Sequence, residues 1–502
     1  MKRLLRATKC LLAALAAGAL LFAPAGAAPR RASKADKANA ELSAQLLAHI
    51  VELSSDAYEG REPGTDGEAR TLRYLGKQWF DIGLQSGTND PGHPWFVPVT
   101  IVAREPEGSR LQFTRKSKRL FLPPEATLVL TSGKRSLVEN APLLFVGSGK
   151  AIPPRAELAG RVAVLLDGDD ETSERQNALL KAGASAVLTV LDGDRSLENV
   201  SDRRRRLGYA LAGEELGGDI EAFITAAGMD RMLAASNLSV AKLQALAAAP
   251  DFSRRVLELA ATLEATTRET RIHTHNAIAK LPGRRPELGA VLLVAHWDHF
   301  GRCVPPPAED QICNGAVDNA SGLAVMTEVA RRLAKGPPMD RDVYFLATTG
   351  EELGLLGAEA FAADPPMQLS SIVAAFNIDT VAIAPAGQPF GVVGKGLTAL
   401  DPQIAVVAKA ERRKLAEGDA ANAYVKRQDG WALLQHDVPA VMISSSWGDI
   451  ARVEQFMETD YHRPSDQVGP GLELGGAVDD VWFLTALTRW FADPKKVPAK
   501  AG

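Results

Sequence analysis

Four short apolar runs in the second half of the chain have the length of buried β-strands. They occupy residues 290–295, 343–348, 372–378 and 440–444. Stretches of helical length, at 321–334 and 355–363, separate the first three runs. Continuous apolar strands that alternate with helices are typical of a largely parallel sheet covered on both faces. We therefore predict an α/β fold, with a mostly parallel mixed sheet sandwiched by helices.

The first half of the chain shows two other patterns. Apolar side chains recur at helical spacing at Leu42, Leu46, Ile50 and Leu53, and again from Leu72 to Trp79, which predicts two helices around a Gly- and Pro-containing turn. A polar linker, residues 29–37, precedes them. From residue 125 to 254 the hydrophobic pattern changes to short apolar runs of strand length, which predicts a small β-rich inserted domain. The expected catalytic domain therefore has two parts, 28–124 and 255–502.

The first 27 residues have the features of an export signal. Basic residues are followed by an apolar run at 11–22 and by small residues at 25–27. Because this run is shorter than the roughly 20 residues of a bilayer span, we expect a cleaved signal peptide and no stable membrane anchor afterwards. The mature protein would be periplasmic or secreted; an uncleaved anchor is the alternative.

Composition narrows the classes of protein. With 502 residues, 46% hydrophobic and 24% charged, the chain has the composition of a folded protein of two or three domains. The net charge of −4 and the lack of a long basic stripe argue against nucleic acid as a partner. The sequence does not indicate an oligomeric state.

Two cysteines, Cys303 and Cys313, flank a short Pro-rich loop. In an oxidising compartment such a pair is more plausibly bridged than free, so we predict a disulfide. The alternative, a zinc-binding pair, lacks nearby partners at the spacing of a zinc finger.

Metal-binding residue types follow three of the predicted strands. In an open α/β sheet, ligands bind in the crevice beyond the carboxyl ends of the strands. The candidates at this edge, or in the segments that reach it, are His296, Asp318, Glu351, Glu352, Asp379 and His462. Each residue alone has a structural explanation: a hydrogen-bonded core histidine, a helix cap, a strand-end turn or a residue that serves a helix dipole. Their convergence on one predicted edge favours a metal site.

These ligand types could bind two zinc ions. His296 and Asp379 could hold one ion and Glu352 and His462 the other, with Asp318 between them. Adjacency alone does not decide which of Glu351 and Glu352 is the ligand. The other would be the general base, which takes a proton from metal-bound water and leaves a metal-activated hydroxide as the nucleophile.

Two further residues are candidates for supporting roles. Asp298 lies two residues after His296 on extended chain, so its carboxylate is placed to accept the second ring N–H of His296. Tyr461 could donate a hydrogen bond to a developing oxyanion, or it could simply pack. His299 could be only a neighbour of these residues.

At these residues the chain resembles the di-zinc exopeptidases typified by aminopeptidase Y and the secreted bacterial leucyl aminopeptidases. That family also includes glutamate carboxypeptidase, glutaminyl cyclase and the transferrin receptor. The matching segments are AHWDH, NGAVDNASG, GEELGLLGAE, NIDT and DYHRPSD, with SSDAYEGREPGTDGE and HNAIAKLPG before them. The segments NAPLLFVGSG, ELAGRVAVLL and KAGASAVL resemble a shortened protease-associated (PA) domain within 125–254.

The resemblance implies two zinc ions, with Glu351 as the base and Glu352 as the ligand. It implies a zinc exopeptidase fold and an aminopeptidase that acts on peptides. A carboxypeptidase, a dipeptidase and a glutaminyl cyclase are alternatives within the family, and a receptor-like binding protein without activity is an alternative of another class. The stretch from Arg427 to Gly430 departs from the pattern of many relatives, which affects expectations about substrate preference rather than catalysis.

Overall fold

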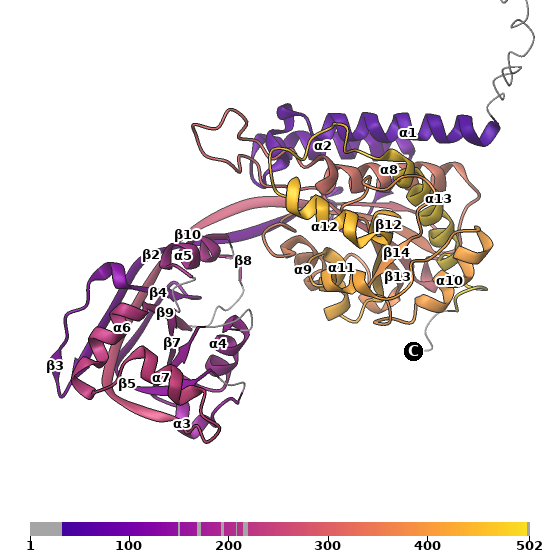
Figure 1. Ribbon diagram of the computed structural model, residues 1–502. Helices are drawn as coiled ribbons and strands as arrows, with labels where there is room; N and C mark the ends of the chain where they lie inside the picture. Colours follow the sequence, from indigo (N-terminus) through magenta and orange to yellow (C-terminus); the bar gives the residue numbers. More distant parts are fainter. Residues whose placement is uncertain are drawn as a thin grey trace, which may run out of the picture.

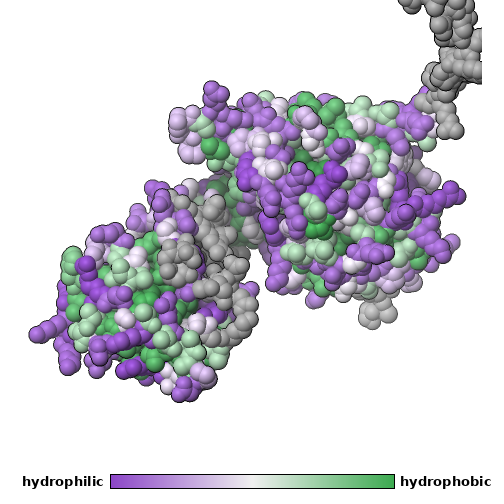
Figure 2. Space-filling model, in the orientation of Figure 1, coloured by the Kyte–Doolittle hydropathy of each residue, from purple (hydrophilic) through white to green (hydrophobic). Residues whose placement is uncertain are grey.

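The computed structural model describes residues 33–148, 151–167, 172–191, 195–206, 208–213 and 219–498. The predicted export signal, residues 1–27, lies outside this part of the chain. Figure 1 shows two lobes joined by two long strands, β2 (Phe96–Arg115) and β10 (Arg255–Leu281). When all atoms are drawn, the lobes remain distinct bodies, with hydrophilic side chains over much of the visible face of each (Figure 2).

The larger lobe contains the predicted parallel strands. They are β11 (Ala290–His296), β12 (Asp342–Thr348), β13 (Ile372–Asn377) and β15 (Ala440–Ser444), in the order β15-β13-β11-β12, and all are parallel. The short strand β14 (Gly391–Val393) pairs antiparallel with β15 at one edge, and β10 pairs antiparallel with β12 at the other. The prediction of a mostly parallel mixed sheet is confirmed.

Helices cover both faces of this sheet, as the continuous apolar strands predicted. On one face lie α1 (Lys34–Leu53), α2 (Asp66–Ile82), α8 (Gly322–Lys335) and α13 (Leu474–Phe491); on the other lie α9 (Leu356–Ala363) and α11 (Asp429–Gln435). Side chains of β11 alternate between the two cores: Val291 and Leu293 face the first layer, whereas Leu292 and Val294 face the second. Each such side chain, fully buried, stabilises the fold by about 1.5–3 kcal/mol.

The ends of the first helices follow from local sequence. Ser33 caps α1 and forms a capping box with Asp36, so this helix begins inside the segment expected to be a linker. Gly83, in the left-handed region at φ 90°, ends α2. The remaining helices of the larger lobe, α10 (Asp401–Ala410) and α12 (Ile450–Thr459), lie late in the chain.

The smaller lobe has its own core. Its strands β5 (Arg135–Gly147), β6 (Val162–Leu166), β7 (Ala186–Leu191) and β9 (Ile220–Thr225) are parallel in that order, and β4 (Thr127–Thr131) closes the edge. Its helices include α4 (Thr172–Lys181), α6 (Ala226–Leu233) and α7 (Val240–Ala247).

One continuous sheet joins the lobes because β10 runs through both. Alternate residues of its first half, Leu257, Leu259, Ala261, Leu263 and Ala265, are buried in the core of the smaller lobe, where Phe113 of β2 joins them. That core therefore takes in residues on both sides of the segment 125–254. Among the described residues, no helix combines the length and the apolar composition needed to cross a membrane.

Candidate metal centre

Chain topology brings the five predicted metal ligands to one edge of the larger sheet. His296 ends β11, Glu352 follows β12, and Asp379 lies two residues beyond β13. Asp318 lies in the turn before α8, and His462 follows α12. Because parallel strands end at the same edge, these side chains meet although they are far apart in sequence.

Asp318 lies between two pairs of side chains. Its Oδ1 is 3.2 Å from Nε2 of His296, which is also 3.5 Å from Oδ1 of Asp379. Its Oδ2 is 3.4 Å from Nε2 of His462, which is also 3.0 Å from Oε2 of Glu352. Each carboxylate oxygen of Asp318 therefore faces one histidine–carboxylate pair.

The donor atoms of this cluster fit metal ions. Nε2 of His296, Oδ2 of Asp318 and Nε2 of His462 are buried and have no hydrogen-bond partner. Such orphaned atoms are costly unless something binds them. A tetrahedral zinc ion with bonds of about 2.0–2.1 Å separates its ligand atoms by about 3.3 Å, which is the range of the distances above.

The electrostatics of the cluster also favour cations. Burial raises the pKa of Asp318, but its contacts with His296 and His462 outweigh burial and hold that pKa well below its usual value. Burial lowers the pKa of His296, but the negative charge of Glu351 and the carboxylates of Asp318 and Asp379 raise it well above the usual value. Burial also lowers the pKa of His462, but the carboxylates of Glu352 and Asp318 outweigh burial and raise that pKa to about 9. A metal ion would compete with protons for the same imidazole nitrogens.

Glu351 differs from its neighbour Glu352. A carboxylate oxygen of Glu351 lies within 4.8 Å of ligand atoms of His296 and Glu352. Burial, together with the negative charges of Glu352 and Asp379, raises the pKa of Glu351 well above its usual value, whereas the pKa of Glu352 is lowered despite its burial because His299 and His462 lie close to it. A buried carboxylate with a raised pKa has the affinity for protons that a general base needs.

Tyr461 lies over the cluster. Its ring stacks on that of His462 at 3.5 Å between centroids, and its hydroxyl lies 3.3 Å from Nη2 of Arg427, which donates to it. Burial and the charges of Asp318 and Glu352 raise the pKa of Tyr461 well above its usual value, so the hydroxyl keeps its proton and can donate it in a hydrogen bond.

The contact predicted for Asp298 is made by a different atom. Nδ1 of His296 lies 3.1 Å from the backbone carbonyl oxygen of Asp298 and 3.9 Å from its carboxylate oxygen. The carboxylate instead accepts the backbone N–H of Glu351, at 3.2 Å. The turn after β11 directs the carbonyl to the ring, so Asp298 is near His296 as expected, but the main chain makes the bond.

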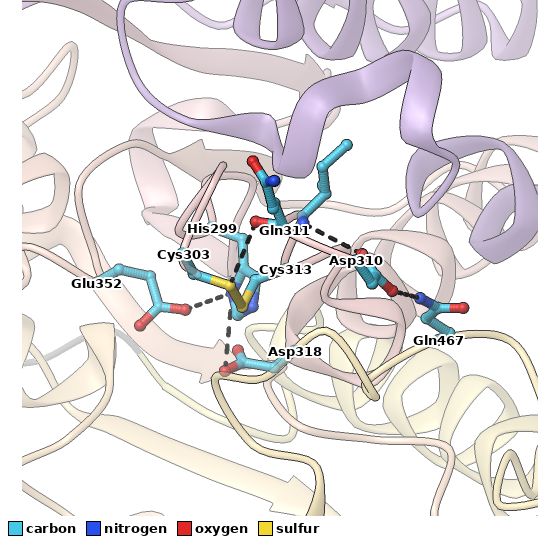
Figure 3. Close-up of a disulfide and its surroundings, with 9 residues drawn as sticks. His299, Cys303, Asp310, Gln311, Cys313, Asp318, Glu352 and Gln467 are labelled. Carbon is cyan, nitrogen blue, oxygen red and sulfur yellow. Dashed lines mark hydrogen bonds and ion pairs between the residues drawn. A yellow bond between two sulfur atoms is a disulfide. The ribbon is translucent and has the colours of Figure 1, made fainter. Parts of the chain in front are cut away.

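His299 contributes more than the sequence suggested. Its Nδ1 lies 2.6 Å from Oε1 of Glu352 and 4.0 Å from Oδ2 of Asp318 (Figure 3). Together with these two residues, His299 forms another group of side chains that could hold a metal ion. The signal was present in the second histidine of AHWDH, three residues after His296. It can orient the Glu352 carboxylate.

A pocket opens beside the cluster. Three carboxylates are part of its lining, those of Asp318, Glu351 and Asp379. Most of the remaining lining consists of aromatic and methionine side chains: Tyr424, Met442, Trp447, Met457 and Tyr461. Among the described residues that line the pocket, Arg427 is the only cation. Trp447 also donates its indole N–H to the backbone carbonyl of Asp379, at 3.0 Å.

A disulfide closes the loop beside the cluster. Cys303 and Cys313 are bonded, with their Cα atoms 5.7 Å apart. Figure 3 shows this bridge next to His299, with the loop residue Asp310 accepting from Gln467 at 2.7 Å. The bridge therefore constrains the chain between His299 and Asp318.

Comparison with known proteins is consistent with this geometry. Residues 276–471 match the model of peptidase family M28. The chain is 37% identical to the alkaline phosphatase isozyme conversion protein of Escherichia coli, over 19% of this chain and 29% of that protein. It is 28% identical to aminopeptidase YwaD of Bacillus subtilis, over 48% of this chain and 44% of that protein. The chain thus spans less than half the length of these curated relatives.

Fold comparison covers more of the chain. An aminopeptidase from Aneurinibacillus sp. strain AM-1 superposes with a TM-score of 0.56 over 92% of this chain and 96% of that one, at 18% sequence identity. At this identity the likeness concerns the fold alone. The family match contains all five predicted metal ligands, His296 to His462, at the positions described above. Residues 276–471 are therefore similar to peptidase family M28, and this similarity includes the whole cluster.

Proposed function

We propose that this protein is a zinc-dependent aminopeptidase that hydrolyses the first peptide bond of its substrates. The observation that carries this proposal is the position of Asp318, whose two oxygens face two histidine–carboxylate pairs with buried, unpartnered donor atoms. His296 and Asp379 would hold one zinc ion, and Glu352 and His462 the other, with Asp318 shared. Bound zinc would lower the pKa of a water molecule and polarise the scissile carbonyl group.

The chain's own groups would divide the remaining work. Glu351 takes a proton from the attacking water and delivers it to the leaving amine nitrogen, so that one water is consumed as the C–N bond breaks. The Tyr461 hydroxyl, oriented by Arg427, donates a hydrogen bond to the oxygen on which negative charge develops. The carboxylates that line the pocket attract the free α-ammonium group of a peptide, and its aromatic and methionine lining receives an apolar side chain.

Arg427 favours a second candidate function. Its guanidinium is exposed at the pocket, and a carboxylate would be its natural ligand. A dipeptidase or carboxypeptidase would place the substrate's terminal carboxylate there. The name of aminopeptidase YwaD, a relative over 48% of this chain, supports the first candidate over the second.

A matched substrate panel tests the proposal. The zinc-loaded protein should release the N-terminal residue from aminoacyl anilides and from unblocked peptides, and N-acetylation should abolish the reaction. Cleavage of N-blocked peptides from their carboxyl end would support the carboxypeptidase. Cyclisation of N-terminal glutamine peptides would support the cyclase. Zinc binding without turnover on any of these substrates would support a receptor-like protein.

Export and domain organisation belong to the same proposal. An export signal at 1–27 and the Cys303–Cys313 bridge support a periplasmic or secreted enzyme, since disulfides persist in oxidising compartments. The smaller lobe would be the PA-like insert, joined to the catalytic domain by β2 and β10. Its distinct core supports this division.

A further inference from the structure

Arg61 is a buried cation whose hydrogen bonds all go to the main chain. Its side chain is 0% exposed. Among the described residues it donates to five backbone carbonyls, at 2.5–3.4 Å: those of Leu53, Trp297, Asn314, Gly315 and Asp318. Burying a charge without a carboxylate partner is costly, and an apolar side chain of similar size would avoid the cost. Arg61 therefore calls for an explanation beyond packing.

The carbonyls that Arg61 binds belong to the segments that carry the proposed ligands. Trp297 directly follows His296, and the carbonyls of Gly315 and Asp318 lie in the turn that presents the Asp318 carboxylate. Burial lowers the pKa of Arg61 to about 10, and nearby carboxylates, led by Asp466 and Asp318, limit the fall. The guanidinium thus remains charged at neutral pH, beside a cluster of negative charges.

Asp466 binds the same turn from its amide side. Its Oδ1 accepts the backbone N–H of Val317 at 2.9 Å, and its Oδ2 accepts that of Asp318 at 3.0 Å. The backbone carbonyl of Asp466 accepts the N–H of Ala316 at 3.1 Å. Segment 315–318 is therefore held by a cation at its carbonyls and by an anion at its amides.

Backbone conformation shows how tightly this arrangement is determined. Gly315 has φ 57°, and a Cβ there would lie 2.1 Å from the carbonyl oxygen of Asp318 and 2.8 Å from Nη2 of Arg61. Arg61 itself has φ 52°, a left-handed conformation that residues with side chains rarely adopt. Such conformations persist where surrounding contacts impose them, and they are concentrated at functional sites.

We propose that Arg61 and Asp466 are positioning residues, which together hold the 315–318 turn so that Asp318 can bind both metal ions. The inference rests on the proposed function, because it assumes that this cluster binds zinc. Because the turn is already fixed, zinc binding does not lose free energy by ordering it. Groups that orient metal ligands in this way contribute about 10–100-fold to metal affinity.

Arg341 provides a matched control at the opposite edge of the sheet. It is also 0% exposed, and it too donates to backbone carbonyls, those of Leu288, Phe491 and Val497 at 2.6–2.8 Å. It lies just before β12, far from the carboxyl ends of the strands. A substitution of Arg341 therefore removes a buried arginine of the same kind but changes no contact of the metal cluster.

The test compares zinc affinity in Arg61→Met and Arg341→Met, measured on the full chain by competition with a chromogenic chelator. We expect Arg61→Met to weaken zinc binding about 10–100-fold, and Arg341→Met to lower the melting temperature but leave zinc affinity within about twofold. Arg61→Lys, which keeps the charge but not the planar set of donors, should recover part of the affinity. The proposal would be overturned if Arg61→Met bound zinc as tightly as the wild type, or if Arg341→Met weakened zinc binding as much as Arg61→Met does.

A second variant covers the case in which Arg61→Met does not fold. Asp466→Asn keeps the size of the side chain but removes the negative charge and one acceptor, so it should also weaken zinc binding, and unchanged affinity would count against the proposal. If the wild-type chain binds zinc but cleaves no peptide, the proposed function fails while the affinity comparison still decides the role of Arg61. If the wild-type chain binds no zinc, both fail.

Discussion

The two edges of the larger sheet are built from the same strands but treat polar groups differently. At the amino edge, Arg341 binds three carbonyls and the carboxylate of Asp342 accepts the N–H of Gly283 at 2.7 Å. At the carboxyl edge, buried polar atoms without hydrogen-bond partners gather, on His296, His299, Asp318 and His462 among others. The named groups at the amino edge are satisfied within the protein, whereas several at the carboxyl edge lack a partner and belong to one cluster.

The unpartnered polar groups lower the stability of the metal-free fold at the edge where the proposed ligands lie. Buried polar groups that lack partners cost about 1–3 kcal/mol each, so their concentration at one edge needs a compensating ligand. A metal ion at that point would supply the missing interactions for several of them at once.

The largest effect should follow from the loss of the proposed base. Glu351→Gln keeps the shape of the side chain but cannot accept a proton, so turnover should fall by at least about 10²–10⁴-fold while the zinc content stays that of the wild type. Steady-state kinetics and metal analysis on the same preparation measure this. Glu417→Gln, at an exposed position, is the control and should leave both unchanged. Substantial activity in Glu351→Gln would refute the assignment of the base.

The disulfide beside the carboxyl edge should contribute to stability. Replacing both Cys303 and Cys313 with serine should cost about 3 kcal/mol of unfolding free energy, since the bridge closes a loop with a sequence separation of 10. Denaturant unfolding of the metal-free protein measures this. Because the loop links His299 to Asp318, zinc affinity should also fall, and an unchanged affinity would show that the loop does not constrain the ligands.

A smaller effect concerns the pH dependence of stability without metal. The pKa of His462 is raised to about 9 in the folded chain from an ordinary 6.5, so folding favours its protonated form. That stabilisation is complete below about pH 6.5 and is lost as the pH rises through about 9. Melting temperatures in a chelator should therefore fall over this range, and His462→Gln should flatten the decline. An equal decline in both proteins would exclude this histidine as the source.

Much of the carboxyl edge could be predicted from the sequence because its signal is local. An apolar run such as 290–295 that ends in His-Trp-Asp-His shows both the strand and the residue types at its end. Helices after the turns, such as α8 and α9, begin and end within about one residue of their predicted limits. Parallel topology then brings the ends together without further information.

The parts that escaped prediction depend on tertiary contacts. Arg61 lies in the turn predicted between the first two helices, but nothing local reveals that most of its partners are carbonyls of residues 297–318. The direction of the Asp298 carbonyl depends on the turn geometry after β11, which the spacing of two residues does not determine. The 27-residue strand β10 was missed because its alternating pattern continues through two cores.

Counting bound zinc in the wild type and in Asp318→Asn shows whether two metal ions share this carboxylate. We expect two zinc ions per wild-type chain after dialysis at neutral pH. We also expect a marked loss of both in Asp318→Asn, since each oxygen of that carboxylate faces one of the two pairs. Fewer than one ion per wild-type chain, or undiminished zinc in Asp318→Asn, would contradict the proposed di-zinc centre.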